Sequence, residues 1–127
     1  MSIKLQVQKD RTIGEVQYDF NRAYPFLKIE MFHNEDGKAG AVNKERLGST
    51  VILKAAGLLQ EGEIEIADAM TVGQLEKYFK DSFGMIVQVS RKLGTIWLET
   101  TMTDSWTLKQ QNEHGLEFST HTRKPSE

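Results

Sequence analysis

The chain has 127 residues, of which 39% are hydrophobic and 27% charged, and its formal net charge is −2. A chain of this length removes roughly two-thirds of its unfolded surface from water, which is enough for one domain without a cross-link. It contains no cysteine, which excludes disulfides, thiolate nucleophiles and cysteine-built metal centres. No concentrated basic stripe is present, so the charge pattern does not predict a nucleic-acid partner.

Residues 2–8 alternate apolar and polar side chains, which predicts a first β-strand. They contain no apolar run long enough for a signal peptide or a membrane-spanning helix. We therefore expect a cytoplasmic protein with no membrane partner.

Two segments 59 residues apart share one helical pattern. Each starts at a threonine, Thr12 or Thr71, and each ends at a helix breaker, Pro25 or Gly84. The apolar positions follow at steps of three, four and four, which predicts one buried stripe per helix: Ile13, Val16, Phe20 and Tyr24 in the first, and Val72, Leu75, Phe79 and Phe83 in the second. The pairs Thr12 with Glu15 and Thr71 with Gln74 have the spacing of a capping box.

Strands are predicted on both sides of each helix. Alternation predicts strands at Ile64–Ile66, Leu27–Met31 and Met85–Val89, and a last strand is expected after each Leu-Gly pair, over 47–53 and 93–98. This order predicts two tandem β-α-β-β repeats, residues 2–55 and 61–100. Together with a C-terminal helix, they are expected to form a single α+β domain over residues 1–118.

The two predicted repeats differ in the connection between their last strands. Arg91 to Gly94 is short enough for a tight turn, whereas residues 33–49 form a long polar excursion. Long irregular segments are uncommon in compact domains, so the 33–49 loop is a candidate pocket wall for a small-molecule-binding protein or minor enzyme.

The C-terminal region lies outside the repeat. Residues 104–115 include Trp106 and Leu108 and close with Gly115, which predicts a short helix at about 104–114. Residues 119–127 are polar and are expected to form a flexible tail.

These elements predict a two-layer α+β sandwich in which both helices cover one face of the strands. Strand parity leaves Lys28, Glu30 and Phe32 on the opposite, open face, and Trp97 joins them if Ile96 and Leu98 point inward. Strand order stays open, because tandem units can form one continuous sheet or exchange their hairpins.

No group with catalytic spacing emerges. His33, His114 and His121 lack the spacing of a helical metal site, so no metal or cofactor is predicted. The three carboxylates Glu61, Glu63 and Glu65 lie on one side of a strand, where they are expected to discourage edge-to-edge association. We predict no catalytic residue and expect a binding role.

One segment carries a family resemblance. The Thr-Val-Gly opening at Thr71, the Phe-Gly stop at Gly84, the strand at Met85–Val89 and the stretch 103–108 resemble a segment of small uncharacterised bacterial proteins. The resemblance covers about 71–113. It implies a bacterial α+β domain of unknown function and transfers no functional residue.

The sequence therefore predicts a protein-interaction or self-associating domain that uses the open face of its sheet. The expected partner is a second copy, as a homodimer, or another protein. Weak single-stranded nucleic-acid binding at Arg91, Lys92 and Trp97 is a further alternative. The predicted interaction surface has three aromatic anchors and two basic rim residues: Phe32, Trp97, Trp106, Arg91 and Lys92.

Overall fold

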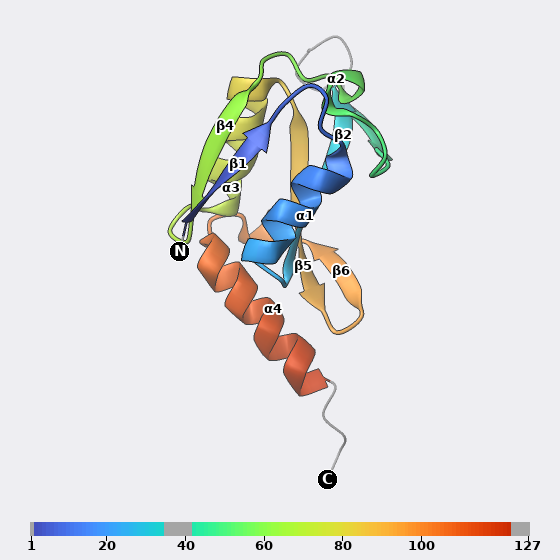
Figure 1. The fold of residues 1–127 in the computed structure, drawn as a ribbon. Helices are drawn as coiled ribbons and strands as arrows, with labels where there is room; N and C mark the ends of the chain where they lie inside the picture. Colours follow the sequence, from blue (N-terminus) through green and yellow to red (C-terminus); the bar gives the residue numbers. More distant parts are fainter. Residues whose placement is uncertain (1, 35–41, 123–127) are drawn as a thin grey trace.

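The computed structural model describes residues 2–34 and 42–122, and its ribbon is drawn in Figure 1. The strands are β1 (Ser2–Val7), β2 (Leu27–Asn34), β3 (Val42–Arg46), β4 (Gly62–Ala67), β5 (Ile86–Leu93) and β6 (Ile96–Glu99). The α-helices are α1 (Ile13–Ala23), α2 (Leu53–Ala56), α3 (Val72–Tyr78) and α4 (Leu108–Thr122), with a π-helical turn η2 (Phe79–Phe83) and a 3₁₀ turn η3 (Thr101–Thr103). The predicted α+β class and C-terminal helix are confirmed, while the tandem repeat stays a prediction.

The strands divide into two antiparallel sheets. β1 pairs with β4 as a two-stranded ribbon, and the other four strands form a sheet in the order β3-β2-β5-β6. Leu5 lies opposite Ile64 in the ribbon, and Glu30 lies opposite Gln88 in the larger sheet. Both central pairings thus join a strand of the first half to a strand of the second, which the sequence pattern had left open.

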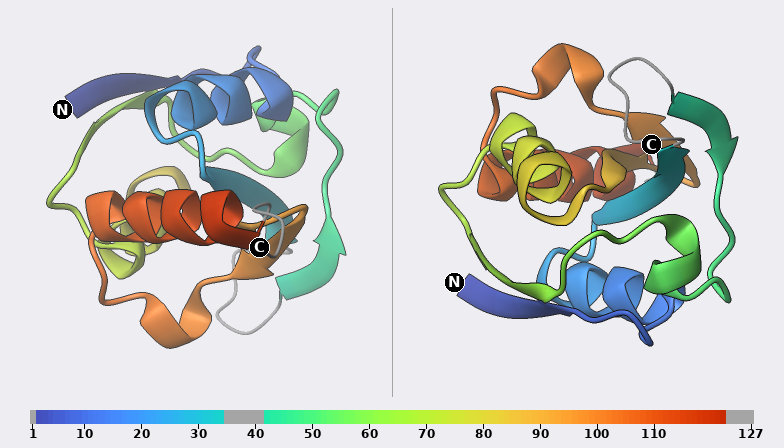
Figure 2. Two further views of the ribbon diagram at one scale, coloured as in Figure 1. Left: turned by 90° about the horizontal axis from the view of Figure 1, so that it is seen from below. Right: turned by 90° about the horizontal axis from the view of Figure 1, so that it is seen from above.

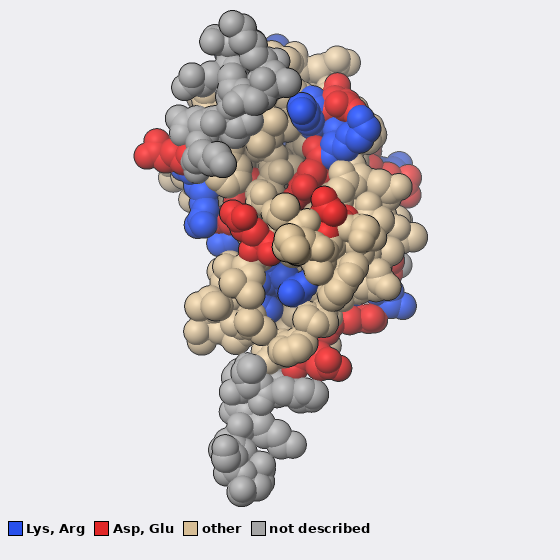
Figure 3. Space-filling model, turned by 180° about the vertical axis from the view of Figure 1, so that it is seen from behind, with Lys and Arg blue, Asp and Glu red and all other residues tan. Residues whose placement is uncertain are grey.

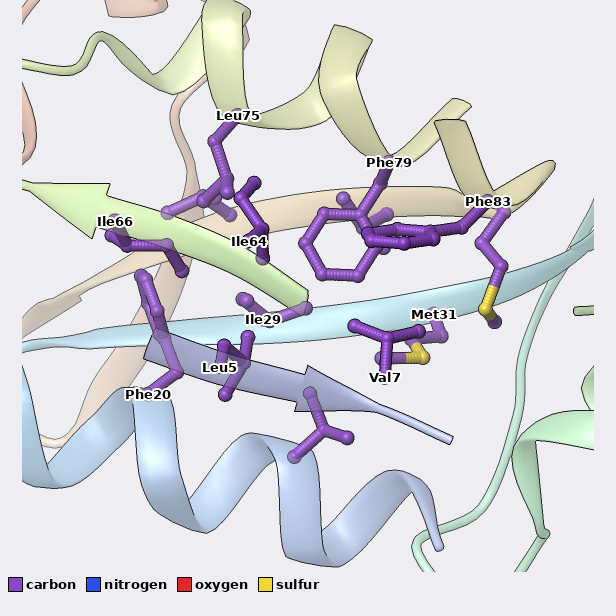
Figure 4. Close-up of a cluster of buried hydrophobic side chains, with 14 of the residues drawn as sticks. Leu5, Val7, Phe20, Ile29, Met31, Ile64, Ile66, Leu75, Phe79 and Phe83 are labelled. Atoms are coloured by element: carbon purple, nitrogen blue, oxygen red, sulfur yellow. The ribbon is translucent and has the colours of Figure 1, made fainter. Parts of the chain in front are cut away.

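The core lies between the two sheets. The ribbon crosses over β2 and β5, and α1 and α3 close the space on either side (Figure 4). Side chains from all four walls are fully or almost fully buried, among them Leu5, Ile64, Ile29, Phe20 and Phe79. Both predicted helical stripes are buried at every position.

Both long helices begin as predicted. Thr12 accepts a hydrogen bond from Glu15 N–H while the Glu15 side chain accepts one from Thr12 N–H, and Thr71 and Gln74 repeat the arrangement. Gly84 ends the second helix with φ +69°, a left-handed conformation that glycine adopts without strain.

The strand predicted over 47–53 is wrong, because this segment bonds to the start of α1. Gly14 N–H donates to Ser49 O at 2.9 Å and Ile13 N–H to Val51 O at 2.8 Å. The third strand of the first half is β3, inside the segment predicted as the 33–49 loop. Of that predicted loop, residues 35–41 lie outside the described residues.

The C-terminal helix starts later and ends later than the predicted 104–114. Asp104 O and Trp106 O accept hydrogen bonds from Gly73 and Val72 N–H, so residues 104–106 lie against the start of α3. Thr107 then caps α4 by accepting from Gln110 N–H. Gly115 does not end the helix, and residues 119–122, predicted as tail, belong to it.

Candidate functional site

The candidate site is the side of the four-stranded sheet that faces away from the core, called the outer face below. The α-helices in closest contact with β2 and β5 pack beside the buried residues of these strands, on the opposite side, while the 3₁₀ turn η3 reaches the outer face at Gln88, whose Nε2 lies 3.5 Å from Thr101 Oγ1. The outer face carries, by strand parity and pairing, Lys28, Glu30, Phe32, Arg46, Ile86, Gln88, Ser90, Lys92, Trp97 and Glu99. Figure 3 views the molecule from behind, where basic, acidic and uncharged side chains are interspersed.

Trp97 is held in place on the outer face. It lies directly opposite Lys92 in the β5–β6 pairing, and its side chain is partly exposed. The Lys28 ammonium nitrogen lies 4.9 Å from the centre of the indole ring, a cation–π distance. This contact reaches from β2 across β5 to β6, and it lies over the ring while the Trp97 side chain stays partly exposed.

Glu30 is buried at the centre of the same face, with 6% of its surface exposed. Its carboxylate accepts a hydrogen bond from Ser90 Oγ at 3.0 Å and lies 3.1 Å from Arg46 Nη1 and 3.6 Å from Lys28 Nζ. A buried carboxylate needs such partners, because leaving it without them in a dry environment is costly. The charge of Glu30 is thus compensated within the chain.

The five residues of the predicted surface fall into two groups. Phe32, Lys92 and Trp97 lie on the outer face, as expected from parity. Arg91 and Trp106 do not, because Arg91 has the parity of the buried Val89 and points to the side that α4 covers. The five residues therefore do not share one face of the sheet, and their role as an interaction surface stays a prediction.

Arg91 belongs to a cluster beneath α4. Its Nη1 donates to Gln111 Oε1 at 2.7 Å, and its guanidinium carbon lies 5.5 Å from the centre of the Trp106 ring. The His114 ring lies between Trp106, at 5.2 Å, and Phe118, at 4.4 Å between ring centres. Burial lowers the pKa of His114, and the neighbouring Arg91 charge adds to the effect.

The sequence predicted the outer-face residues of the regular strands. It did not predict residues whose contacts are made with segments distant in the sequence. Arg46 was missed because its strand was interpreted as part of a loop. Gln111 and His114 lie inside the predicted helix, but the sequence does not show that this helix packs on Arg91. Phe118 was missed because the predicted helix ended at 114. A helical spacing of three to four residues from Leu108 to Ser119 is the signal that could have placed them.

The described part of the chain was also searched for pockets and metal sites. One shallow concave surface lies beside Glu76 and Asp104, and another lies between β1 and α1 near Asp19 and Arg22. Among the described residues that line them, none belongs to 33–34 or 42–49, the described parts of the segment predicted to line a small-molecule pocket. Within residues 2–34 and 42–122, no group of three or more His, Asp or Glu side chains is arranged to hold a metal ion.

In that same part of the chain, no helix combines the length and apolar character needed to cross a membrane. The chain was also compared with known proteins at the level of families, sequences and structures. No family model, curated protein or solved structure matched it.

Proposed function

We propose that the protein is a non-catalytic interaction domain that binds a second copy of itself through the outer face. The observation that carries the proposal is Trp97, a large ring in contact with Lys28 on a sheet face that the described α-helices leave uncovered. Tryptophan is enriched among the residues that dominate binding energy, because it supplies a large contact area with few rotatable bonds. Phe32, two strands away on the same face, is the second aromatic anchor.

The distribution of charge supports a second copy as the partner. Lys28, Lys92 and Arg46 share the outer face with Glu30 and Glu99. A two-fold dimer presents the same patch from both sides, so a patch of mixed sign can face itself without overall repulsion. The net charge of −2 adds little long-range repulsion between two chains.

Sedimentation equilibrium over a concentration series tests the proposal. We expect the wild-type protein to dimerise and Trp97→Ala to weaken the dimer at least about fivefold, the equivalent of about 1 kcal/mol. Tyr18→Ala is the matched control, since Tyr18 is an exposed aromatic residue on α1, away from the outer face. A wild-type protein that stays monomeric, or a dimer that Trp97→Ala leaves unchanged, contradicts self-association through this face.

A further inference from the structure

The free edge of β6 supports a second kind of binding, independent of the self-association above. We propose that β6 accepts an extended strand of another protein whose side chains alternate between acidic and apolar residues. β6 is the last strand of the sheet order, so one row of its backbone groups has no neighbouring strand among the described elements. Figure 1 shows it at the margin of the molecule.

The two edges of the four-stranded sheet differ in their protection. Native proteins usually guard an edge strand with charged side chains or proline, which discourage pairing with another chain. The edge strand β3 ends in Glu45 and Arg46, whereas β6 begins Ile-Trp-Leu and has one charged residue, Glu99, at its end. Of the two edge strands as described, β6 thus carries the fewer charged side chains and the weaker protection against strand addition.

On the helical side of the sheet, the edge is apolar. Ile96 is 53% exposed and Leu98 is 37% exposed, and both point to this side because their partners Leu93 and Arg91 do. Neighbouring strands place facing side chains within contact distance. Residues of an added strand that point to this side gain most by being apolar.

On the outer face, the same edge is basic. Trp97 lies opposite Lys92, and the Lys28 ammonium lies over its ring. Among the described residues Lys92 has no ion-pair partner, whereas Lys28 is shared with Glu30 at 3.6 Å. An acidic side chain opposite Trp97 would approach two lysines. Glu99, two residues further along the strand, lowers the gain from the next acidic side chain, so the acid opposite Trp97 is expected to contribute most of the selectivity.

The apolar helical side and the basic outer face of the β6 edge together define the sequence pattern of the strand that would bind there. Successive residues of a strand point to opposite sides of the sheet, so one strand meets the apolar side with every second residue and the basic side with the others. Backbone hydrogen bonds to β6 supply affinity, and the alternating side chains supply selectivity, as in other strand-addition complexes.

Titration with two blocked peptides, one alternating Glu and Val and the other Lys and Val, tests this inference by isothermal calorimetry. We expect the acidic peptide to bind at least about tenfold more tightly than the basic one. Leu98→Lys, which adds a charge to the apolar side, and Lys92→Glu, which removes one from the basic side, are each expected to weaken the acidic peptide about tenfold. The matched controls Leu116→Lys and Lys54→Glu change exposed residues on α4 and α2 and are expected to have no effect.

Amide hydrogen exchange separates strand addition from contact by side chains alone. Strand addition slows exchange at the β6 amides when the acidic peptide binds, and unchanged exchange would overturn the inference. Equal binding of the two peptides would also overturn the inference. A further contradicting result would be that neither peptide binds while Leu98→Lys dissociates a dimer of the protein, because the edge would then be occupied by β6 of a second copy. Self-association through the outer face is judged separately, by Trp97→Ala in the absence of peptide.

Discussion

The two halves of the chain, residues 2–56 and 62–122, begin alike and end differently. In each, a segment returns after the third strand and pairs with the residue before the capping threonine. Leu53 N–H donates to Arg11 O and Leu108 N–H donates to Met70 O, both at 2.8 Å. The same connection between strand, helix and returning segment is therefore made twice.

The difference lies in how the helices continue. α2 ends after four residues at Gly57, whose φ of +107° closes the helix, whereas α4 continues for 15 residues. α1 is regular over 11 residues, while α3 changes into a π-helical turn after seven. α1 and α3 thus share the signal that starts the helix, whereas residues beyond the first turn decide its length and what it covers.

The largest expected effect comes from the buried aromatic residues that occupy equivalent places in the two helices. Phe20 and Phe79 are both fully buried, and each packs on a second ring, at 5.5 Å for Tyr24 and 5.4 Å for Phe83. Replacing either by alanine leaves a cavity and is expected to lower the free energy of unfolding by about 3–5 kcal/mol. Urea unfolding measures both. A loss below about 1 kcal/mol in one variant would show that its half contributes little to the common core.

Smaller effects are expected where each helix touches its returning segment. A Cβ on Gly14 would lie 3.0 Å from Ser49 O, and one on Gly73 would lie 3.3 Å from Asp104 O. Overpacking of this kind costs about 1–3 kcal/mol, against which alanine regains up to about 1 kcal/mol of helix propensity. Gly14→Ala should therefore destabilise the protein more than Gly73→Ala in thermal unfolding. If Gly73→Ala proved the more destabilising, the segment around Ser49 would move away from an added methyl group more easily than the segment around Asp104.

The helix caps should contribute equally in the two halves. Thr12→Ala and Thr71→Ala each remove a side-chain oxygen that accepts a backbone N–H at 3.1 Å. A loss of about 1 kcal/mol is expected for each. Chemical denaturation of both variants side by side checks this, and Thr→Ser at the same position, which keeps the hydroxyl, is the control. Unequal losses of stability would indicate that one of the two helix starts is stabilised mainly by its backbone hydrogen bonds to the returning segment rather than by the threonine cap.

Local signals in the sequence were enough to place the starts of α1 and α3 and their buried stripes. A capping box acts over three residues and an apolar stripe over one helix face, so both can be seen in Thr71 and its following residues without any tertiary information. The inward and outward residues of β2, β5 and β6 followed from parity for the same reason.

What the sequence could not predict depends on contacts between distant segments. The stretch 47–53 has the composition of a strand, yet its carbonyl oxygens bond to the amides that start α1. Gly115 has the usual identity of a helix terminator, yet α4 needs it inside the helix because a side chain there would meet Phe26 Cβ at 2.8 Å. Strand parity alone places Arg91 on the side opposite Trp97, whereas the contact of Trp106 with Arg91 depends on how the segment before α4 packs, which no local pattern encodes.

The smallest expected effect is a difference in pH dependence at one equivalent position of the two helices. Gln17 on α1 donates to Ile29 O at 2.8 Å, whereas Glu76 on α3 accepts from Val89 N–H at 3.1 Å. Burial raises the pKa of Glu76 above its usual 4.5, although the hydrogen bond from Val89 opposes the shift. A carboxyl with a raised pKa binds its proton more tightly in the folded state, so its contribution to stability falls as pH rises from 4.5 through the folded pKa.

Glu76→Gln keeps an oxygen for Val89 N–H and removes the ionisation. The variant should be more stable than wild type at pH 7, and the advantage should shrink as pH falls to 4.5 and below, because the wild-type carboxyl is then protonated too. Urea unfolding at a series of pH values measures the difference. Gln17→Glu is the reverse experiment: its ionised carboxylate cannot donate to Ile29 O, so stability should be lost at neutral pH and regained in acid. An advantage of Glu76→Gln that grows on acidification would show that the carboxylate of Glu76 stabilises α3 against β5 in its charged form.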